Sequence, residues 1–216
     1  MPSNFNRGSE WRKWDLQVQT ILDDGYTSIS TYADELKALD PEKWDKLCQL
    51  IGSEELVLKY DSKAYFANDT TDDKKARSYN YARVFVGFLE VFHEHEKMVV
   101  CITDHNYYDD FLIDALLKVS ESSVITILPG VEINVEGVHQ LVIFNEKVYG
   151  KTTYADSIKQ FLSQINIHNA KTNGKLTVSN SSYVNVINEV RKCGAFLMYA
   201  HCNSTKGLFQ ERGKTD

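Results

Sequence analysis

Hydrophobic positions along the chain change their spacing at about residue 97. Before that point, apart from a short apolar run at 14–18, the clearest pattern has apolar residues every three or four positions, which is typical of amphipathic helices. Beyond it, short apolar runs alternate with helical patterns, as in sheets whose strands are buried on both faces. The apolar runs predict strands over residues 14–18, 98–103, 124–128, 138–144 and 195–200. The helical spacing predicts helices over residues 30–50, 74–94, 109–119, 154–165 and 183–192.

Alternation of strands and helices indicates an α/β fold with a mostly parallel sheet. The segment 26–97 departs from this pattern, because about seventy residues separate the first two predicted strands and a compact connection needs far fewer. We therefore expect a helical insertion there, packed on a barrel or sheet. Pro41 divides its first helix, since proline suits a first helical turn, and Asp40 fits the N-cap of the second piece.

Composition and charge exclude several classes of protein. The chain of 216 residues suits one generous domain or two small ones. Its net charge of −6 argues against a general nucleic-acid coat, although a local basic groove or bound metals would still attract phosphate. The four cysteines lack CxxC spacing, and no apolar run approaches the ~20 residues that cross a bilayer. We expect a cytoplasmic protein with no membrane partner.

Polar residues collect at the predicted strand ends, where parallel α/β folds carry their chemistry. Imidazole and carboxylate groups are the usual ligands of zinc, manganese and iron. A single histidine at a strand end is commonly an ordinary loop residue, but the whole set predicts a metal site. The residues at or near strand ends are Gln17, Gln19, Asp23, Asp24, Asp104, His105, Glu132, His139 and His201.

Four short motifs follow one another along the chain, each at one of these strand ends. One short match would carry little weight, whereas four in a fixed order are specific. They are DLQVQT at 15–20 followed by Asp24-Gly25, TDHN at 103–106, GVEI at 130–133 followed by His139, and AH at 200–201. The series resembles the motifs of the PHP (polymerase and histidinol phosphatase) superfamily, which read D-L-H-x-H-T, T-D-H-N, G-x-E-I and A-H-P.

The resemblance implies a distorted (β/α)7 barrel with a helical insertion between its first two core strands. It also implies hydrolysis of phosphoesters by two or three clustered divalent ions, which would be manganese, zinc, magnesium or iron. Such ions hold a phosphate, lower the pKa of a bridging water and neutralise the leaving oxygen. The implied metal ligands are Asp24, His105, Glu132, His139 and His201. The implied catalytic residues are Asp104, His105 and His201.

The chain departs from the family pattern at three points, and the first and the last of them change what we expect. Gln17 and Gln19 replace the two histidines of the first motif, and a neutral amide is a weak ligand, so one metal position is expected to bind poorly or be lost. Cys202 stands where the fourth motif usually has proline. The family's final aspartate-x-histidine motif has no counterpart before Asp216, so we expect a C-terminally incomplete barrel and a longer parent protein.

A narrower resemblance rests on residues 7–15 (RGSEWRKWD), together with the two glutamines and the insertion. These features look like the amino-terminal PHP domain of PHP–ATPase proteins of the TrlF type, several of which act in bacterial defence against phage. The resemblance implies a nuclease whose partners are nucleic acid and an SMC/ABC-like ATPase domain of the same chain.

Two other functions remain open. The glutamines fit a degenerate, non-catalytic PHP module that binds nucleic acid or a partner. The acidic balance fits a small-molecule phosphatase of the histidinol-phosphate type. The sequence leaves the oligomeric state open.

Overall fold

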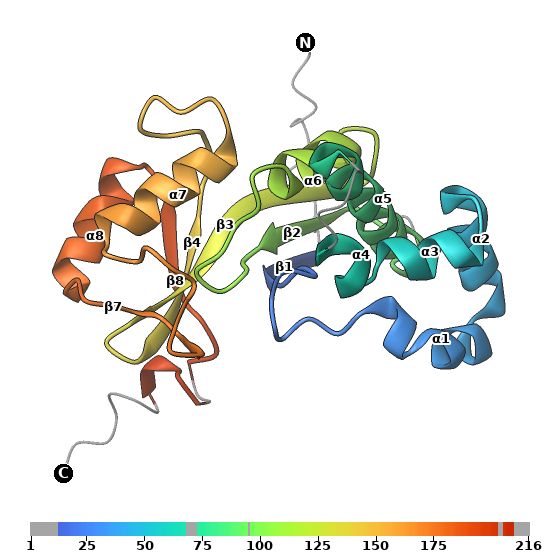
Figure 1. Cartoon of the computed structure of the whole chain (residues 1–216), viewed down its shortest axis with the longest axis horizontal. Helices are drawn as coiled ribbons and strands as arrows, with labels where there is room; N and C mark the ends of the chain where they lie inside the picture. Colours follow the sequence, from blue (N-terminus) through green and yellow to red (C-terminus); the bar gives the residue numbers. More distant parts are fainter. Residues whose placement is uncertain (1–12, 68–72, 95, 203–204, 210–216) are drawn as a thin grey trace, which may run out of the picture.

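The computed structural model describes residues 13–67, 73–94, 96–202 and 205–209. Its described residues form a mixed α/β fold around a curled six-stranded sheet of order β1-β2-β3-β4-β8, with β7 paired to β3 off this path (Figure 1). A two-stranded hairpin of β5 (Lys171–Thr172) and β6 (Lys175–Leu176) lies apart from this sheet. The strands of the main sheet are β1 (Lys13–Val18), β2 (Met98–Ile102), β3 (Ile125–Val135), β4 (Val138–Ile143), β7 (Val178–Ser179) and β8 (Phe196–Tyr199).

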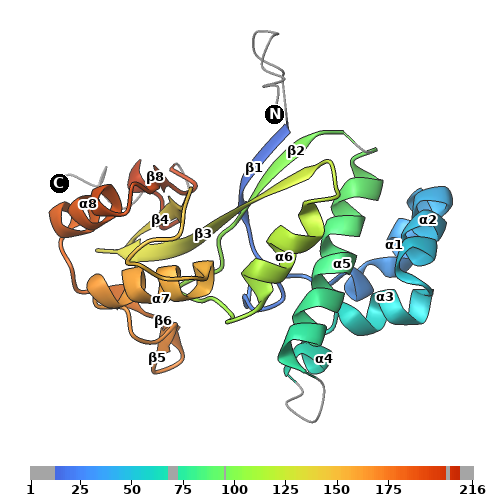
Figure 2. The same ribbon diagram turned by 90° about the horizontal axis from the view of Figure 1, so that it is seen from above.

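Strand β3 joins the two halves of the molecule, as Figure 2 shows. Its first half pairs in parallel with β2, up to Ile102 opposite Pro129, and its second half pairs antiparallel with β4 from Gly130 onward. A Cβ atom on Gly130 would lie 2.8 Å from the sulfur of Cys101 and 2.9 Å from the carbonyl oxygen of Val142. Glycine is therefore required where β3 changes partner, because the neighbouring strands leave no room for a side chain.

The sheet is mixed, so the parallel arrangement predicted from the sequence holds only in part. Strands β1, β2 and the first half of β3 are parallel, whereas β4 is antiparallel to both β3 and β8. Strand β3 also runs well past the predicted 124–128, and β8 is not buried, since Phe196 is 66% exposed. The curled sheet is compatible with a distorted barrel.

Helices fill the chain between β1 and β2. They are the 3-10 helix η1 (Ile29–Thr31) and the helices α1 (Ala33–Leu39), α2 (Pro41–Ile51), α3 (Glu54–Tyr60), α4 (Lys63–Ala67) and α5 (Lys74–Phe92). The predicted cap of α2 is confirmed, because the Asp40 carboxylate accepts a hydrogen bond from the Lys43 amide. Helix α5 packs Tyr81 and Phe85 on the sheet, while α1 to α3 pack on its other side (Figure 2). Helix α5 is thus the helix that crosses over between β1 and β2.

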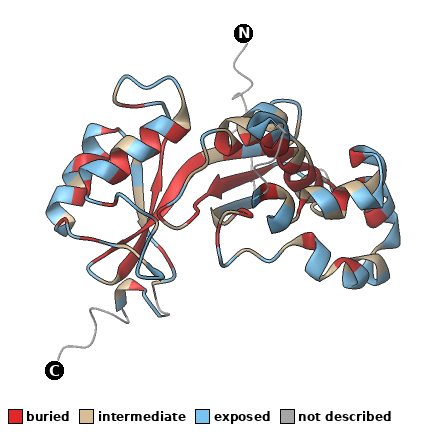
Figure 3. Cartoon of the chain, viewed as in Figure 1, coloured by how far each residue is buried: buried red, intermediate tan, exposed pale blue. Residues whose placement is uncertain are grey.

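The remaining helices pack on the sheet, whose strands β2, β3 and β4 are mostly buried (Figure 3). Helix α6 (Leu112–Ser120) connects β2 to β3, and α7 (Tyr154–Gln164) and α8 (Tyr183–Lys192) pack on the second half of β3 and on β4. Val131 and Ile133 of β3 lie in this core. Because side chains alternate along a strand, Glu132 between them points to the opposite face.

No helix of the described residues is long and apolar enough to span a bilayer. The four cysteines, all of which are described, are free.

Candidate metal centre

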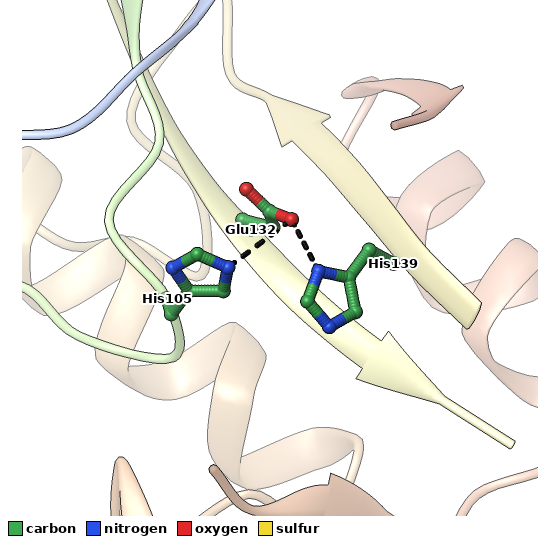
Figure 4. A group of neighbouring side chains, drawn as sticks. All are labelled: His105, Glu132 and His139. Atoms are coloured by element: carbon green, nitrogen blue, oxygen red, sulfur yellow. Dashed lines mark hydrogen bonds and ion pairs between the residues drawn. The ribbon is translucent and has the colours of Figure 1, made fainter. Parts of the chain in front are cut away.

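Glu132 lies at the centre of a cluster of imidazole side chains. The side chain is fully buried in β3, and its Oε1 atom lies 2.6 Å from Nδ1 of His139 and 3.2 Å from Nε2 of His105 (Figure 4). Nε2 of His201 lies 3.9 Å from the same oxygen. One carboxylate oxygen thus faces three histidines that are far apart in the sequence.

Strand pairing brings these histidines together. His105 follows β2 and forms a parallel bridge with Glu132, whose backbone amide donates to the carbonyl oxygen of Asp104. His139 lies on β4, the antiparallel neighbour of β3, and His201 follows β8 on the other side of β4. The ring centroid of His139 lies 5.2 Å from that of His105 and 5.3 Å from that of His201. The site therefore spans four neighbouring strands: Glu132 lies within β3, His139 near the start of β4, and His105 and His201 shortly after β2 and β8.

The two glutamines of the first motif contact the other oxygen of this carboxylate. Nε2 of Gln17 donates to Oε2 of Glu132 over 3.0 Å and lies 3.1 Å from Nδ1 of His201. Nε2 of Gln19 donates to the same Oε2 over 3.4 Å. The end of β1 therefore supplies two neutral amides to the cluster.

The electrostatics of the cluster favour an ionised Glu132 beside a protonated His105. Burial acts to raise the pKa of Glu132, but hydrogen bonds from His105 and His139 outweigh it and lower this pKa to about 2. Burial likewise acts to lower the pKa of His105, but Asp23 and Glu132 outweigh it and raise this pKa to about 10. Burial lowers the pKa of His201. A metal ion bound at His105 would therefore displace a proton.

The structure places Asp23, rather than Asp24, beside the cluster. Oδ2 of Asp23 accepts a hydrogen bond of 2.8 Å from the backbone amide of His105 and lies 2.8 Å from its Nδ1. A carboxylate that binds the second ring nitrogen of a histidine fixes the ring and raises its basicity as a metal ligand. Asp24 is exposed and forms an ion pair with Lys171. The sequence placed both aspartates near the end of the first strand, but the motif match pointed to Asp24.

Asp104 is buried next to the cluster and holds the chain after β1. Its Oδ1 accepts from the Thr20 amide over 2.6 Å, and its Oδ2 accepts from the Thr20 hydroxyl over 2.7 Å. Burial raises the pKa of this carboxyl to about 7, against these hydrogen bonds. Both oxygens of Asp104 are thus bound to Thr20, which follows Gln17 and Gln19 and so helps to position them.

The donor set fits a divalent cation. One ligand atom from each of His105, Glu132 and His139 lies within 4.8 Å of the other two. Two imidazoles and one carboxylate are a known set of zinc ligands, and they also suit manganese and iron. A cavity of about 230 Å³ reaches His105 and Asp23 and gives a small ligand access to this side of the cluster.

Comparisons with known proteins add little to what the geometry of the site shows. No protein-family model matches the chain, and no curated protein matches it. Among solved structures, the chain is similar to the crystal structure of a candidate metal-dependent phosphoesterase from Bifidobacterium adolescentis, at 13% identity and a TM-score of 0.35. The match covers 89% of this chain and 68% of that chain. A likeness at this level does not bear on the chemistry of the site.

Proposed function

We propose that this chain is a metal-dependent phosphoesterase whose metal centre is built on Glu132. The observation that carries the proposal is the convergence of His105, His139 and His201 on one fully buried carboxylate. Burying a carboxylate costs several kcal/mol unless it is paired, and a single cationic partner would satisfy that need. Three imidazoles around one carboxylate exceed what a structural ion pair requires, whereas they match the ligands of a divalent ion.

The residues divide into distinct roles under this proposal. His105, Glu132 and His139 would hold a divalent ion, which when bound polarises a phosphoryl oxygen and lowers the pKa of water. Asp23 orients the ring of His105 through the two contacts at its Oδ2. His201, which lies next to Gln17 at the edge of the cluster, is placed to bind the phosphate or to donate a proton to the leaving oxygen.

Hydrolysis of bis(p-nitrophenyl) phosphate tests the proposal. We expect turnover with manganese or zinc that EDTA abolishes, and a loss of at least about a hundredfold in His105→Ala and His139→Ala. His93→Ala, at the end of α5, is the matched control and should keep full activity. Turnover that survives in both cluster variants, or no turnover with any divalent ion, would overturn the proposal.

A second candidate function is a non-catalytic binding module. It is favoured by the amides of Gln17 and Gln19, which satisfy Oε2 of Glu132 without a second ion. Elemental analysis separates the two candidates, because the module predicts less than one equivalent of metal in the purified protein. Tightly held metal together with turnover excludes it.

Finer parts of the proposal rest on the sequence resemblance. They are a seven-stranded barrel, nucleic acid as the substrate, an ATPase domain in the same longer chain and a role in phage defence. Of residues 7–15, which carry the narrower resemblance, 7–12 lie outside the described residues. Comparing an oligonucleotide with sugar phosphates as substrates separates a nuclease from a small-molecule phosphatase of the histidinol-phosphate type.

A further inference from the structure

The loop that follows β1, residues 19–28, lies between the metal centre and the helical insertion. On the metal side, Oδ2 of Asp23 accepts a hydrogen bond of 2.8 Å from the backbone amide of His105 and lies 2.8 Å from its ring Nδ1. On the other side, the loop runs past α4 on its way to α1 (Figure 1). The insertion is therefore in a position to act on the metal centre through this loop.

The turn 61–63, between α3 and α4, contacts the loop directly at Asp23. Nζ of Lys63 donates to the backbone carbonyl oxygen of Asp23 over 2.9 Å. The loop itself binds the other side-chain oxygen, because Oδ1 of Asp23 accepts from the Gly25 amide over 2.8 Å. The main chain of Asp23 and one of its carboxylate oxygens are thus both held, and this leaves Oδ2 directed at His105.

Asp61, in the same turn, binds the chain where it leaves the loop toward α1. The residue is fully buried, and its Oδ1 accepts from the Tyr26 hydroxyl while its Oδ2 accepts from the Ile29 amide. Both donors are neutral, and burial raises the pKa of Asp61 to about 6 against these two hydrogen bonds. A carboxylate buried in this way is costly, and an apolar side chain would pack there at lower cost. What the carboxylate contributes is two fixed points on the loop.

Tyr81 of α5 supplies a further contact from the insertion. Its hydroxyl accepts from the Ile21 amide over 3.1 Å, and its ring lies edge-on to that of Tyr26, with centroids 6.3 Å apart. These three residues share one apolar core with Phe66 of α4. Apolar contacts keep the insertion attached, but they are non-directional, so the polar contacts of the turn 61–63 set where the loop lies.

We propose that the turn 61–63 is a positioning element of the metal centre, in which Asp61 and Lys63 hold Asp23 against His105. A carboxylate on the second ring nitrogen of a histidine ligand fixes the ring and strengthens metal binding. The insertion therefore acts on the metal although the turn supplies none of the ligands. The inference rests on the proposed function for its effect on metal affinity, and on the contacts alone for the placement of Asp23.

Hydrogen exchange of the His105 backbone amide, followed by NMR in EDTA, tests the placement of Asp23 without any metal. That amide donates to Oδ2 of Asp23. Lys63→Met keeps the length of the side chain and removes its donor, and Asp61→Asn keeps the shape but replaces one acceptor with a donor. We expect each variant to speed exchange of this amide by about fivefold or more relative to the amides of β2.

Matched controls change the same residue types elsewhere in the insertion. Lys46 is exposed on α2, and Asp40 caps that helix. Because asparagine caps a helix as well as aspartate does, Asp40→Asn and Lys46→Met should keep the exchange ratio of the wild type. Circular dichroism confirms that each variant is folded. Lys63 is exposed, so Lys63→Met keeps the test available if Asp61→Asn does not fold.

Isothermal titration with zinc tests the consequence for the metal. We expect Lys63→Met to weaken zinc binding by about threefold to tenfold, a smaller loss than Asp23→Asn causes, because it acts through Asp23. For the same reason, Lys63→Met/Asp23→Asn should bind zinc within about twofold of Asp23→Asn alone. A structural defect that does not involve Asp23 would instead add its own loss to that of Asp23→Asn.

Two outcomes overturn the inference. One is an exchange ratio at His105 that stays at the wild-type value in both turn variants, and the other is additive losses of zinc affinity in the double variant. The proposed function is scored separately. If the wild type binds no zinc, the metal centre fails and hydrogen exchange still decides the placement of Asp23. If the wild type binds zinc and the exchange ratio is unchanged in both turn variants, the metal centre stands and this inference fails.

Discussion

Gln17 and His139 contact opposite oxygens of the same buried carboxylate. Nε2 of Gln17 lies 3.0 Å from Oε2 of Glu132, and Nδ1 of His139 lies 2.6 Å from Oε1. The histidine offers a nitrogen lone pair to a cation, whereas the amide nitrogen offers only hydrogens. The carboxylate thus has one side that suits a metal ion and one side that is satisfied by neutral donors.

Replacing both glutamines should extend the metal centre. Gln17→His/Gln19→His places two imidazoles beside Oε2 of Glu132, where the wild type has amides. Because imidazole is a much stronger ligand than an amide, we expect at least one more equivalent of bound metal and a higher rate of phosphodiester hydrolysis. Metal content is measured by elemental analysis after dialysis.

A matched control for this variant is Gln49→His on α2, which adds a histidine far along the chain from the motif. Unchanged metal content in the double variant would show that the glutamines do not limit metal binding.

The neighbouring residues Asp23 and Asp24 should differ sharply in their effect on metal affinity. Asp23 contacts the ring of His105, and loss of such a partner typically weakens metal binding by about 10- to 100-fold. Asp24 lies in an exposed ion pair with Lys171, so Asp24→Asn should change affinity by less than about twofold. Isothermal titration with zinc on Asp23→Asn and Asp24→Asn compares them directly. A larger loss in Asp24→Asn would restore the role that the motif match implied for it.

The stability of the metal-free protein should depend on the protonation of His105. Burial acts to lower the pKa of this residue, but Asp23 and Glu132 outweigh it and raise the pKa from 6.5 to about 10. The folded protein therefore holds this proton more tightly than the unfolded chain, so the stabilisation is complete below pH 6.5 and is lost as the pH rises through about 10. Urea denaturation in EDTA should show a decline across this window that His105→Gln reduces. Parallel profiles for the two proteins would refute the expectation.

Gly130 should be essential to the change of partner along β3. An added Cβ would lie 2.8 Å from the Cys101 sulfur and 2.9 Å from the Val142 carbonyl oxygen, so the strands must move apart. We expect Gly130→Ala to lower the free energy of unfolding by about 1–3 kcal/mol, measured by urea denaturation. The same Gly130→Ala substitution should cost less stability when it is made in a Cys101→Ala protein than when it is made in the wild type, because the sulfur that the new Cβ would approach is absent. A Gly130→Ala protein as stable as the wild type would mean that the strands are less closely spaced.

Local signals in the sequence predicted most elements because the physics that forms them is local. Asp40 before Pro41 marked the start of α2, and the run from Tyr183 to Lys192 gave α8 with its bounds. The length of β3 was missed, because Pro129-Gly130 resembles a turn when no partner strand is known. The antiparallel direction of β4 could not be predicted, since a buried apolar run looks alike in either direction.

The candidate site was predictable in its residue types but not in its contacts. Glu132, His105 and His139 were chosen from strand ends and motifs, and the structure brings them together. The contact of Asp23 with His105 depends on which way two adjacent side chains point in the turn after β1, and no spacing rule decides this. The hydrogen bonds from Gln17 and Gln19 to Glu132 depend on side-chain rotamers, which the sequence does not specify.

Anomalous diffraction from crystals grown with zinc or manganese tests the metal centre most directly. We expect a peak within about 2.0–2.3 Å of ligand atoms of His105, Glu132 and His139. We also expect this peak to disappear in His139→Ala. A cluster that keeps the Glu132–His139 contact at saturating metal, with no peak between its side chains, would contradict this expectation.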